Sequence, residues 1–145
     1  MAYCTLADIT KRIPETTLVN LTDDQDLGVI DEAVVSGIIA DADELIDGFL
    51  RGRYELPLAD IPGLVKSLSV DLVAYSIYGR RAEFEIPKAV SDKHAATLKI
   101  LQSIQKGEVR LGVAGVEAPA PAVPANSVQV VTSDRIFTRD SMKGL

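Results

Sequence analysis

The sequence predicts a mainly α protein: a small helical bundle of about four helices, one of them long, with a short β-prone C-terminal extension and an arm. Apolar residues recur every three or four positions in a long stretch that ends at Leu50, and again after Pro62 and after Pro87. The chain of 145 residues has the length of one domain, and its 47% of hydrophobic residues suffice for a core. A proline-rich stretch then separates this body from the last residues.

Two helix-start signals precede the long helix. Thr5 and Asp8 have the spacing of a capping box, and the apolar residues after them recur at helical spacing until Pro14, which is expected to end that helix. Thr22 and Gln25 repeat the spacing of a start signal, and the acids between them suit a helix N-terminus. Thr22 is therefore expected to mark a second helix start.

The dominant element is a helix from about Val29 to Leu50. Its apolar positions form a broad stripe with a helical period, and the acidic residues are expected on the opposite face. Gly37 and Gly48 each weaken such a helix by roughly 1 kcal/mol relative to alanine, so each is expected to mark close packing. The stripe consists of Ile30, Val34, Val35, Ile38, Ile39, Ala42, Leu45, Ile46, Phe49 and Leu50.

The later helices follow prolines. Residues 51–62 contain two prolines and are typical of an extended connector. A third helix is expected to begin near Pro62, a residue tolerated in a first turn, and to end at Gly79. After Pro87 a fourth helix runs to Gly107, with lysines in its last turns, where cations suit the helix dipole. The helical body is therefore expected to span residues 1–107.

The composition changes after this body. Alternating apolar residues in 108–116 predict a short β segment, and residues 117–127 form a proline-rich spacer that is stiff and extended. Residues 128–145 carry large apolar side chains among alternating charges, which favours a docking arm that binds another copy or another protein. Residues 128–131 are expected to add a strand to the partner. The docking residues are expected to be Val128, Val130, Arg135, Ile136, Phe137, Arg139 and Met142.

The net charge of −6 is unevenly distributed along the chain. Residues 1–60 hold thirteen acidic and four basic side chains, a net −9, whereas residues 61–145 hold eight and eleven, a net +3. Two interpretations stay open: the acids form a solvated helix face, or the molecule has an acidic and a basic side that meet head to tail between copies. The second predicts a subunit interface made of Asp41, Asp43, Glu44, Asp47, Arg51, Arg53, Tyr54, Arg80 and Arg81.

Residues that carry enzyme chemistry are few. His94 is the only histidine and Cys4 the only cysteine, and neither stands in a catalytic or metal-binding motif. The acidic run at 23–26 lacks the glycine and the terminal glutamate of a calcium-binding loop. No apolar run approaches the roughly 20 residues that span a bilayer. We therefore expect no enzyme activity, no cofactor, no metal site and no membrane association.

Five stretches together resemble a protein family of Mu-like phages and prophages: MAYCTLADITKRIP, DGFLRGRYELPL, LVKSLSVDLVAYSIYGRR, LKILQSIQKGEVRLGV and SDRIFTRDSMKGL. That family is encoded in the head-morphogenesis region and is similar to the helical head–tail connector (adaptor) proteins. The resemblance covers essentially the whole chain, and its most specific pieces are GRYELPL, GEVRLGV and RIFTRDSMKG. The motif positions carried over are Arg51, Arg53, Tyr54, Leu56, Pro57, residues 107–111, Arg135, Phe137, Arg139 and Gly144.

The resemblance implies a structural virion protein of the neck, without catalytic residues. Such a connector forms a homo-oligomeric ring of about twelve copies that matches the portal, joins head to tail and helps to retain packaged DNA. Its partners would be itself, the portal protein and a downstream neck or tail-completion protein, with DNA passing the channel without sequence-specific binding. It would lie in the host cytoplasm during assembly and in the virion neck afterwards. The alternative is a cytoplasmic regulatory or inhibitor module that binds a partner protein through its C-terminal arm.

Overall fold

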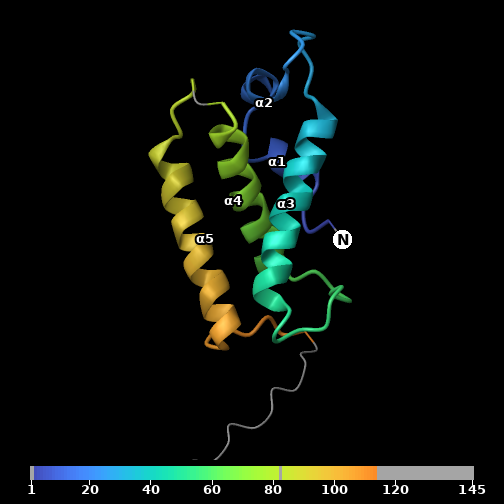
Figure 1. Cartoon of the computed structure of the whole chain (residues 1–145), viewed down its shortest axis with the longest axis vertical. Helices are drawn as coiled ribbons and strands as arrows, with labels where there is room; N and C mark the ends of the chain where they lie inside the picture. Colours follow the sequence, from blue (N-terminus) through green and yellow to red (C-terminus); the bar gives the residue numbers. More distant parts are fainter. Residues whose placement is uncertain (1, 82, 114–145) are drawn as a thin grey trace, which may run out of the picture.

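The computed structural model describes residues 2–81 and 83–113, and within them the chain forms five helices and no strand. Two short helices open the chain and three long ones follow (Figure 1). The mainly α fold class predicted from the sequence is confirmed. The helices are α1 (Leu6–Thr10), α2 (Glu15–Thr22), α3 (Glu32–Leu50), α4 (Gly63–Gly79) and α5 (Lys88–Lys106).

The long helices form the bundle, and α4 is its centre. Helices α3, α4 and α5 contact one another, while α1 and α2 both pack against α4 (Figure 1). Because neighbours surround it, α4 buries residues on most of its circumference and lacks the polar face of a surface helix. Its buried residues are Val65, Leu68, Ser69, Val70, Leu72, Val73, Ala74 and Ile77.

The core is built from aliphatic side chains, as expected for a chain without tryptophan and with few aromatic residues. Each of the five helices contributes to it, so burial of apolar surface holds the whole bundle together rather than one pair of helices. The largest side chains that are fully buried are Ile9, Leu18, Leu21, Ile46, Leu50, Ile77, Leu101 and Ile104.

Local signals fix three helix ends. Thr5 and Asp8 form the capping box that the sequence predicted at the start of α1. The carboxylate of Asp31 accepts hydrogen bonds from the backbone N–H groups of Ala33 at 3.0 Å and Val34 at 3.1 Å, so α3 begins after this cap. Helix α5 ends at Gly107, whose φ of +83° is the left-handed conformation that glycine adopts without strain.

Helix α2 is the element that the sequence interpretation missed. Thr22 was expected to start a helix, but it is the last residue of α2, where its hydroxyl donates to the carbonyl of Leu18 at 2.7 Å. Pro14 was expected to end the first helix, but α1 already ends at Thr10 and Pro14 is the residue that precedes α2. Proline suits that place because a first turn needs no N–H donor there.

The segment after α5 differs from the expected β segment. Residues 108–113 form bends and irregular backbone rather than a strand, and the N–H of Leu111 donates to the hydroxyl of Tyr54 at 3.0 Å. A side chain thus accepts a bond that a partner strand would otherwise take. The expectations for 114–116, for the spacer at 117–127 and for the arm at 128–145 fall outside the described residues. They include the docking residues Val128, Val130, Arg135, Ile136, Phe137, Arg139 and Met142.

Candidate functional site

The acidic residues of α3 do not form one surface. Asp41 and Glu44 are exposed, Asp47 is half-buried and Asp43 is buried at 7% exposure. The sequence interpretation placed all four on the solvent-facing side of the helix, and for Asp43 that placement is wrong. Asp43 lies four residues after Ile39 and three before Ile46, so the helical period places it in the buried stripe.

Buried polar contacts explain how Asp43 is tolerated in the core. Its carboxylate accepts the backbone N–H of Tyr3 at 3.2 and 3.3 Å and the hydroxyl of Ser69 at 3.3 Å. The hydroxyl of Tyr3 donates to Asp47, one turn further along α3. This cluster therefore ties the N-terminal segment to α3 and α4, and Asp43 is unavailable for contact with another subunit.

Burial also sets the protonation of this cluster. Desolvation raises the pKa of Asp43 above its ordinary value, although the bonds from Tyr3 and Ser69 oppose the shift. Desolvation likewise raises the pKa of the Cys4 thiol, whose sulfur lies 3.3 Å from the Ser69 hydroxyl. A buried thiol with a raised pKa is a poor nucleophile. Cys4 therefore acts as a core residue.

The connector residues Arg53 and Tyr54 make contacts within the subunit. The guanidinium of Arg53 donates to the carbonyls of Gln105 at 2.7 Å and Lys106 at 2.6 Å, the last carbonyls of α5. Tyr54 is buried and accepts the N–H of Leu111. The GRYELPL and GEVRLGV motifs therefore pack against each other, and of the connector residues proposed for the interface only Arg51 is exposed.

The two arginines after α4 also bind within the subunit. Arg80 donates to Asp24 and to the carbonyl of Leu21, and Arg81 donates to Asp24 at 3.0 Å. These bonds join the end of α4 to the loop between α2 and α3. Both arginines were expected to meet an acidic helix of a neighbouring copy, but the structure gives them an acid of their own chain.

His94 has a packing role. Its ring stacks on the ring of Tyr75 with centroids 3.8 Å apart and an angle of 11° between the planes, which joins α5 to α4. In the described part of the chain no three side chains of the metal-binding types come together. Likewise, none of the helices described is long and apolar enough to cross a membrane.

An open groove lies between α3 and α5 near their C-terminal ends. It has a volume of about 520 Å³. Leu45 is 44% exposed there, and Phe49 is half-buried beside it. The residues that line the groove are Asp41, Glu44, Leu45, Gly48, Phe49 and Gln105. The sequence contained a signal for it, because the apolar stripe of α3 is wider than the face that the bundle covers.

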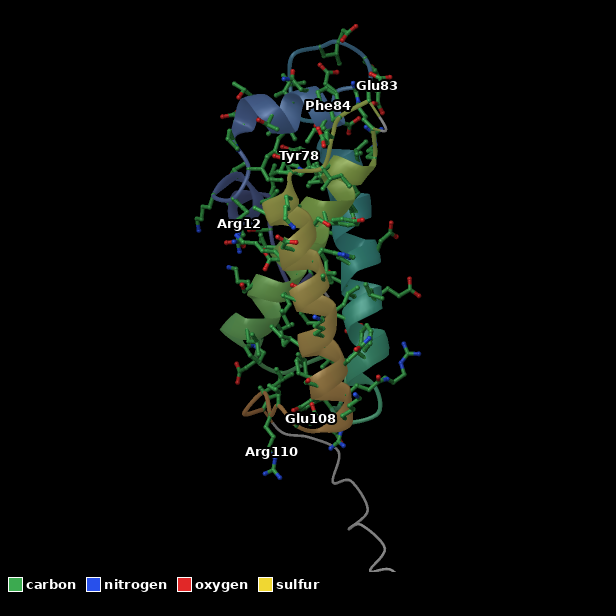
Figure 2. All side chains as sticks on the ribbon, turned by 90° about the vertical axis from the view of Figure 1, so that its left-hand side faces the viewer. Arg12, Tyr78, Glu83, Phe84, Glu108 and Arg110 are labelled. Atoms are coloured by element: carbon green, nitrogen blue, oxygen red, sulfur yellow. The ribbon has the colours of Figure 1, made fainter. Side chains whose placement is uncertain are left out.

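A second exposed apolar area lies at the opposite end of the bundle. Leu27 and Val29 in the loop between α2 and α3 are 67% and 57% exposed, and Phe84 in the loop between α4 and α5 is 41% exposed. Figure 2 places Phe84 and Glu83 at this end, whereas Glu108 and Arg110 lie at the end from which the described chain departs. Among the described residues, exposed large apolar side chains therefore lie at both ends of the bundle, and Leu64 at the start of α4 is a further one at 39% exposure.

Comparison with known proteins supplies the family. The family model described as "Bacteriophage Mu, Gp36" matches residues 3–130 of the chain. The chain is also 29% identical over 140 residues to "Gene product J" of Escherichia phage Mu, covering 96% of each protein. It is 25% identical over 115 residues to the "Mu-like prophage FluMu protein gp36" of Haemophilus influenzae, covering 79% of this chain and 77% of that protein. The chain therefore belongs to the bacteriophage Mu Gp36 family.

Proposed function

We propose that this chain is a structural virion protein of a tailed phage, a head–tail connector that forms a ring beneath the portal. The observation that carries the proposal is membership of a Mu phage family over residues 3–130. In this role the protein joins head to tail and helps to retain packaged DNA, which passes through the channel without sequence-specific binding. Its partners are other copies of itself, the portal protein and the next neck or tail-completion protein.

The surface of the body is consistent with assembly. Exposed apolar side chains gather at the groove between α3 and α5 and at the loops on the opposite end. Apolar side chains at opposite ends suit heterologous contact, in which one surface of a copy meets a different surface of the next. Repeated contacts of this type form a ring when the rotation between copies closes. A ring of about twelve copies would match the portal. Many individually weak contacts would then bind the ring to its partners with high combined affinity.

The polar groups that suggested chemistry are engaged in packing. Cys4 and Asp43 lie in the core, and His94 stacks on Tyr75. These contacts favour a structural role over catalysis, since a catalytic group must reach its substrate.

The test uses purified protein with and without the portal protein. We expect rings or portal-bound complexes in mass photometry and in electron-microscope images, and we expect the protein in the neck of purified virions. A phage that lacks the gene should accumulate separate tails and unjoined heads that have lost their packaged DNA. The proposal would be refuted if the protein stays monomeric, does not bind the portal protein and is absent from virions. That result would favour the alternative of a regulatory module that binds a partner protein.

A further inference from the structure

The groove between α3 and α5 has the chemistry of a docking site. Leu45 and Phe49 line it with apolar side chains, and the exposed residues Asp41 and Glu44 add two carboxylates to the lining. Among the described residues, no lysine or arginine pairs with either carboxylate. The groove therefore suits a ligand that carries a large apolar side chain flanked by positive charges.

Gly48 leaves open space on the surface of the groove. Glycine in a helix interior is about 1 kcal/mol less favourable than alanine, so an internal reason is expected for it. None is found, because a Cβ at Gly48 would meet no atom within 4 Å. Gly48 lines the groove. A separate segment can therefore approach the backbone of α3 closely at this point.

We propose that this groove receives residues 134–143 of a neighbouring copy, an inference that rests on the proposed ring. In an extended segment, alternate side chains share one face, so Arg135, Phe137 and Arg139 would face the groove together. Phe137 fills the space over Leu45 and Phe49. Arg135 and Arg139 then pair with the two carboxylates of the lining.

The spacer argues for a neighbour's groove rather than the chain's own. The described chain ends close to the groove, because Leu111 is bonded to Tyr54 just beyond the C-terminus of α3. Residues 117–127 hold three prolines at 119, 121 and 124, a composition that favours an extended chain of about 3.1 Å per residue. Eleven such residues span roughly 34 Å, which carries the arm away from its starting point.

Charge exchange in the full-length protein tests the pairing. Glu44→Lys and Arg139→Glu should each weaken self-association by at least about fivefold, and the double variant should recover most of the loss. Asp60→Lys is the matched control, because it changes the same charge at an exposed position in the connector between α3 and α4. Sedimentation velocity over a concentration series measures the effect. Single variants that associate like the wild type would overturn the inference.

The glycines of α3 give an independent test. Gly37 lies three turns before Gly48 on the same face, and a Cβ there also meets no atom within 4 Å. Gly37→Gln and Gly48→Gln should both keep or raise the melting temperature, since glutamine is the better helix former. Only Gly48→Gln should weaken association. Equal association by the two variants would count against an occupied groove.

Cross-linking separates a neighbour's groove from the chain's own. Leu45→Cys and Phe137→Cys are prepared as separate full-length proteins of different mass, mixed and oxidised. We expect a disulfide-linked heterodimer, and none from Gly37→Cys mixed with Phe137→Cys. A cross-link that forms only when both cysteines share one chain would overturn the inference. If groove variants assemble into rings as the wild type does, the inference about the groove is wrong but the proposed connector function stands. If the wild-type protein forms no ring, the connector function itself is refuted.

Discussion

At the scale of single residues, Asp43 shows how a charge-bearing side chain becomes part of a core. The carboxylate is buried, yet it accepts the N–H of Tyr3 and the hydroxyl of Ser69, so the donors around it are satisfied. A buried acceptor of this kind is costly to remove because its donors are left without partners. The position therefore tolerates a change of charge better than a loss of hydrogen-bonding atoms.

Two substitutions at Asp43 separate these effects. Asp43→Ala should lower the free energy of unfolding by about 1–3 kcal/mol, because the buried N–H of Tyr3 and the hydroxyl of Ser69 both lose their acceptor. Asp43→Asn keeps one oxygen acceptor and should cost much less at neutral pH. Urea denaturation of the three proteins measures the difference. Equal losses in the two variants would show that the hydrogen bonds contribute nothing.

The raised pKa of Asp43 also predicts a pH dependence. The folded protein binds the Asp43 proton more tightly than the unfolded chain does. Protonation of Asp43 therefore contributes fully to the free energy of unfolding below the ordinary pKa of 3.8, and this contribution is lost as pH rises through the pKa of the folded protein. Asp43→Asn cannot ionise. The unfolding free energy of the wild type should therefore fall relative to Asp43→Asn as pH rises above about 4. A constant difference across this range would contradict the shift.

Gly107 and Arg53 form a second residue-scale pair. A Cβ at Gly107 would collide with the guanidinium of Arg53, and φ is +83° there. Gly107→Ala should therefore lower the free energy of unfolding by about 1–2 kcal/mol, because alanine is strained in the left-handed conformation. A further loss is expected because the new methyl group displaces Arg53 from its carbonyl partners. In an Arg53→Ala background only the backbone cost should remain. Thermal unfolding of the two single variants and the double variant measures the coupling, and strict additivity would refute the contact.

At the scale of elements, Asp24 joins the loop between α2 and α3 to the end of α4. The hydrogen bond from Arg80 is the main cause that lowers the pKa of Asp24 to about 2, and Arg81 adds to it. Because this pKa is lowered, the ionised carboxylate of Asp24 stabilises the fold at any pH above the ordinary pKa of 3.8. That stabilisation is lost as pH falls through about 2.

Asp24→Asn tests this link. The variant should be less stable than the wild type at pH 7, and the difference should vanish as pH falls from about 4 to about 2. Backbone amides of the loop should also exchange faster with solvent, while those of α4 keep their protection. Asp26→Asn is the control in the same loop, since its φ of 54° is one that asparagine tolerates. If the two variants behave alike, the ion pairs do not hold the loop.

How far the sequence predicted these elements depended on how strong the local signals were. Helices α3, α4 and α5 were predicted because long apolar periodicity and flanking prolines or glycines agree with one another. Helix α2 was missed because ETTLVNLT is short and rich in β-branched residues, and its packing on α4 decides its structure. The prediction of a β segment was wrong for residues 108–113, because alternating apolar residues form a strand only where a partner strand is available.

The candidate site was predicted less well than the fold. Helical spacing alone places Asp43 in the core, but the even run of acids along α3 obscured this. The partners of Arg53, Arg80 and Arg81 are at least 52 residues away in sequence, so no local pattern indicated them. The wide apolar stripe of α3 signalled apolar side chains that the bundle leaves uncovered, but the position of the groove depends on how α3 and α5 pack.

At the scale of the whole molecule, the described residues bury a core of their own. This core draws on all five helices, and the final helix ends in the contact of Arg53 with the carbonyls of Gln105 and Lys106. Since residues 128–145 follow a spacer whose prolines favour an extended chain, we expect folding and assembly to be separable in this protein. Removal of the arm is the most direct way to separate them.

Deletion of residues 128–145 should therefore leave a folded body whose melting temperature changes by less than about 4 °C. The same protein, supplied to a Mu-like phage that lacks its own copy, should fail to join heads to tails, because the apolar and basic side chains of the arm are gone. A variant in which glycine and serine replace residues 128–145 keeps the length and should fail equally. Circular dichroism, phage titre and electron microscopy of the lysate measure these outcomes. Normal titre with either variant would show that the arm has no part in assembly, whereas an unfolded deletion variant would show that the body depends on it.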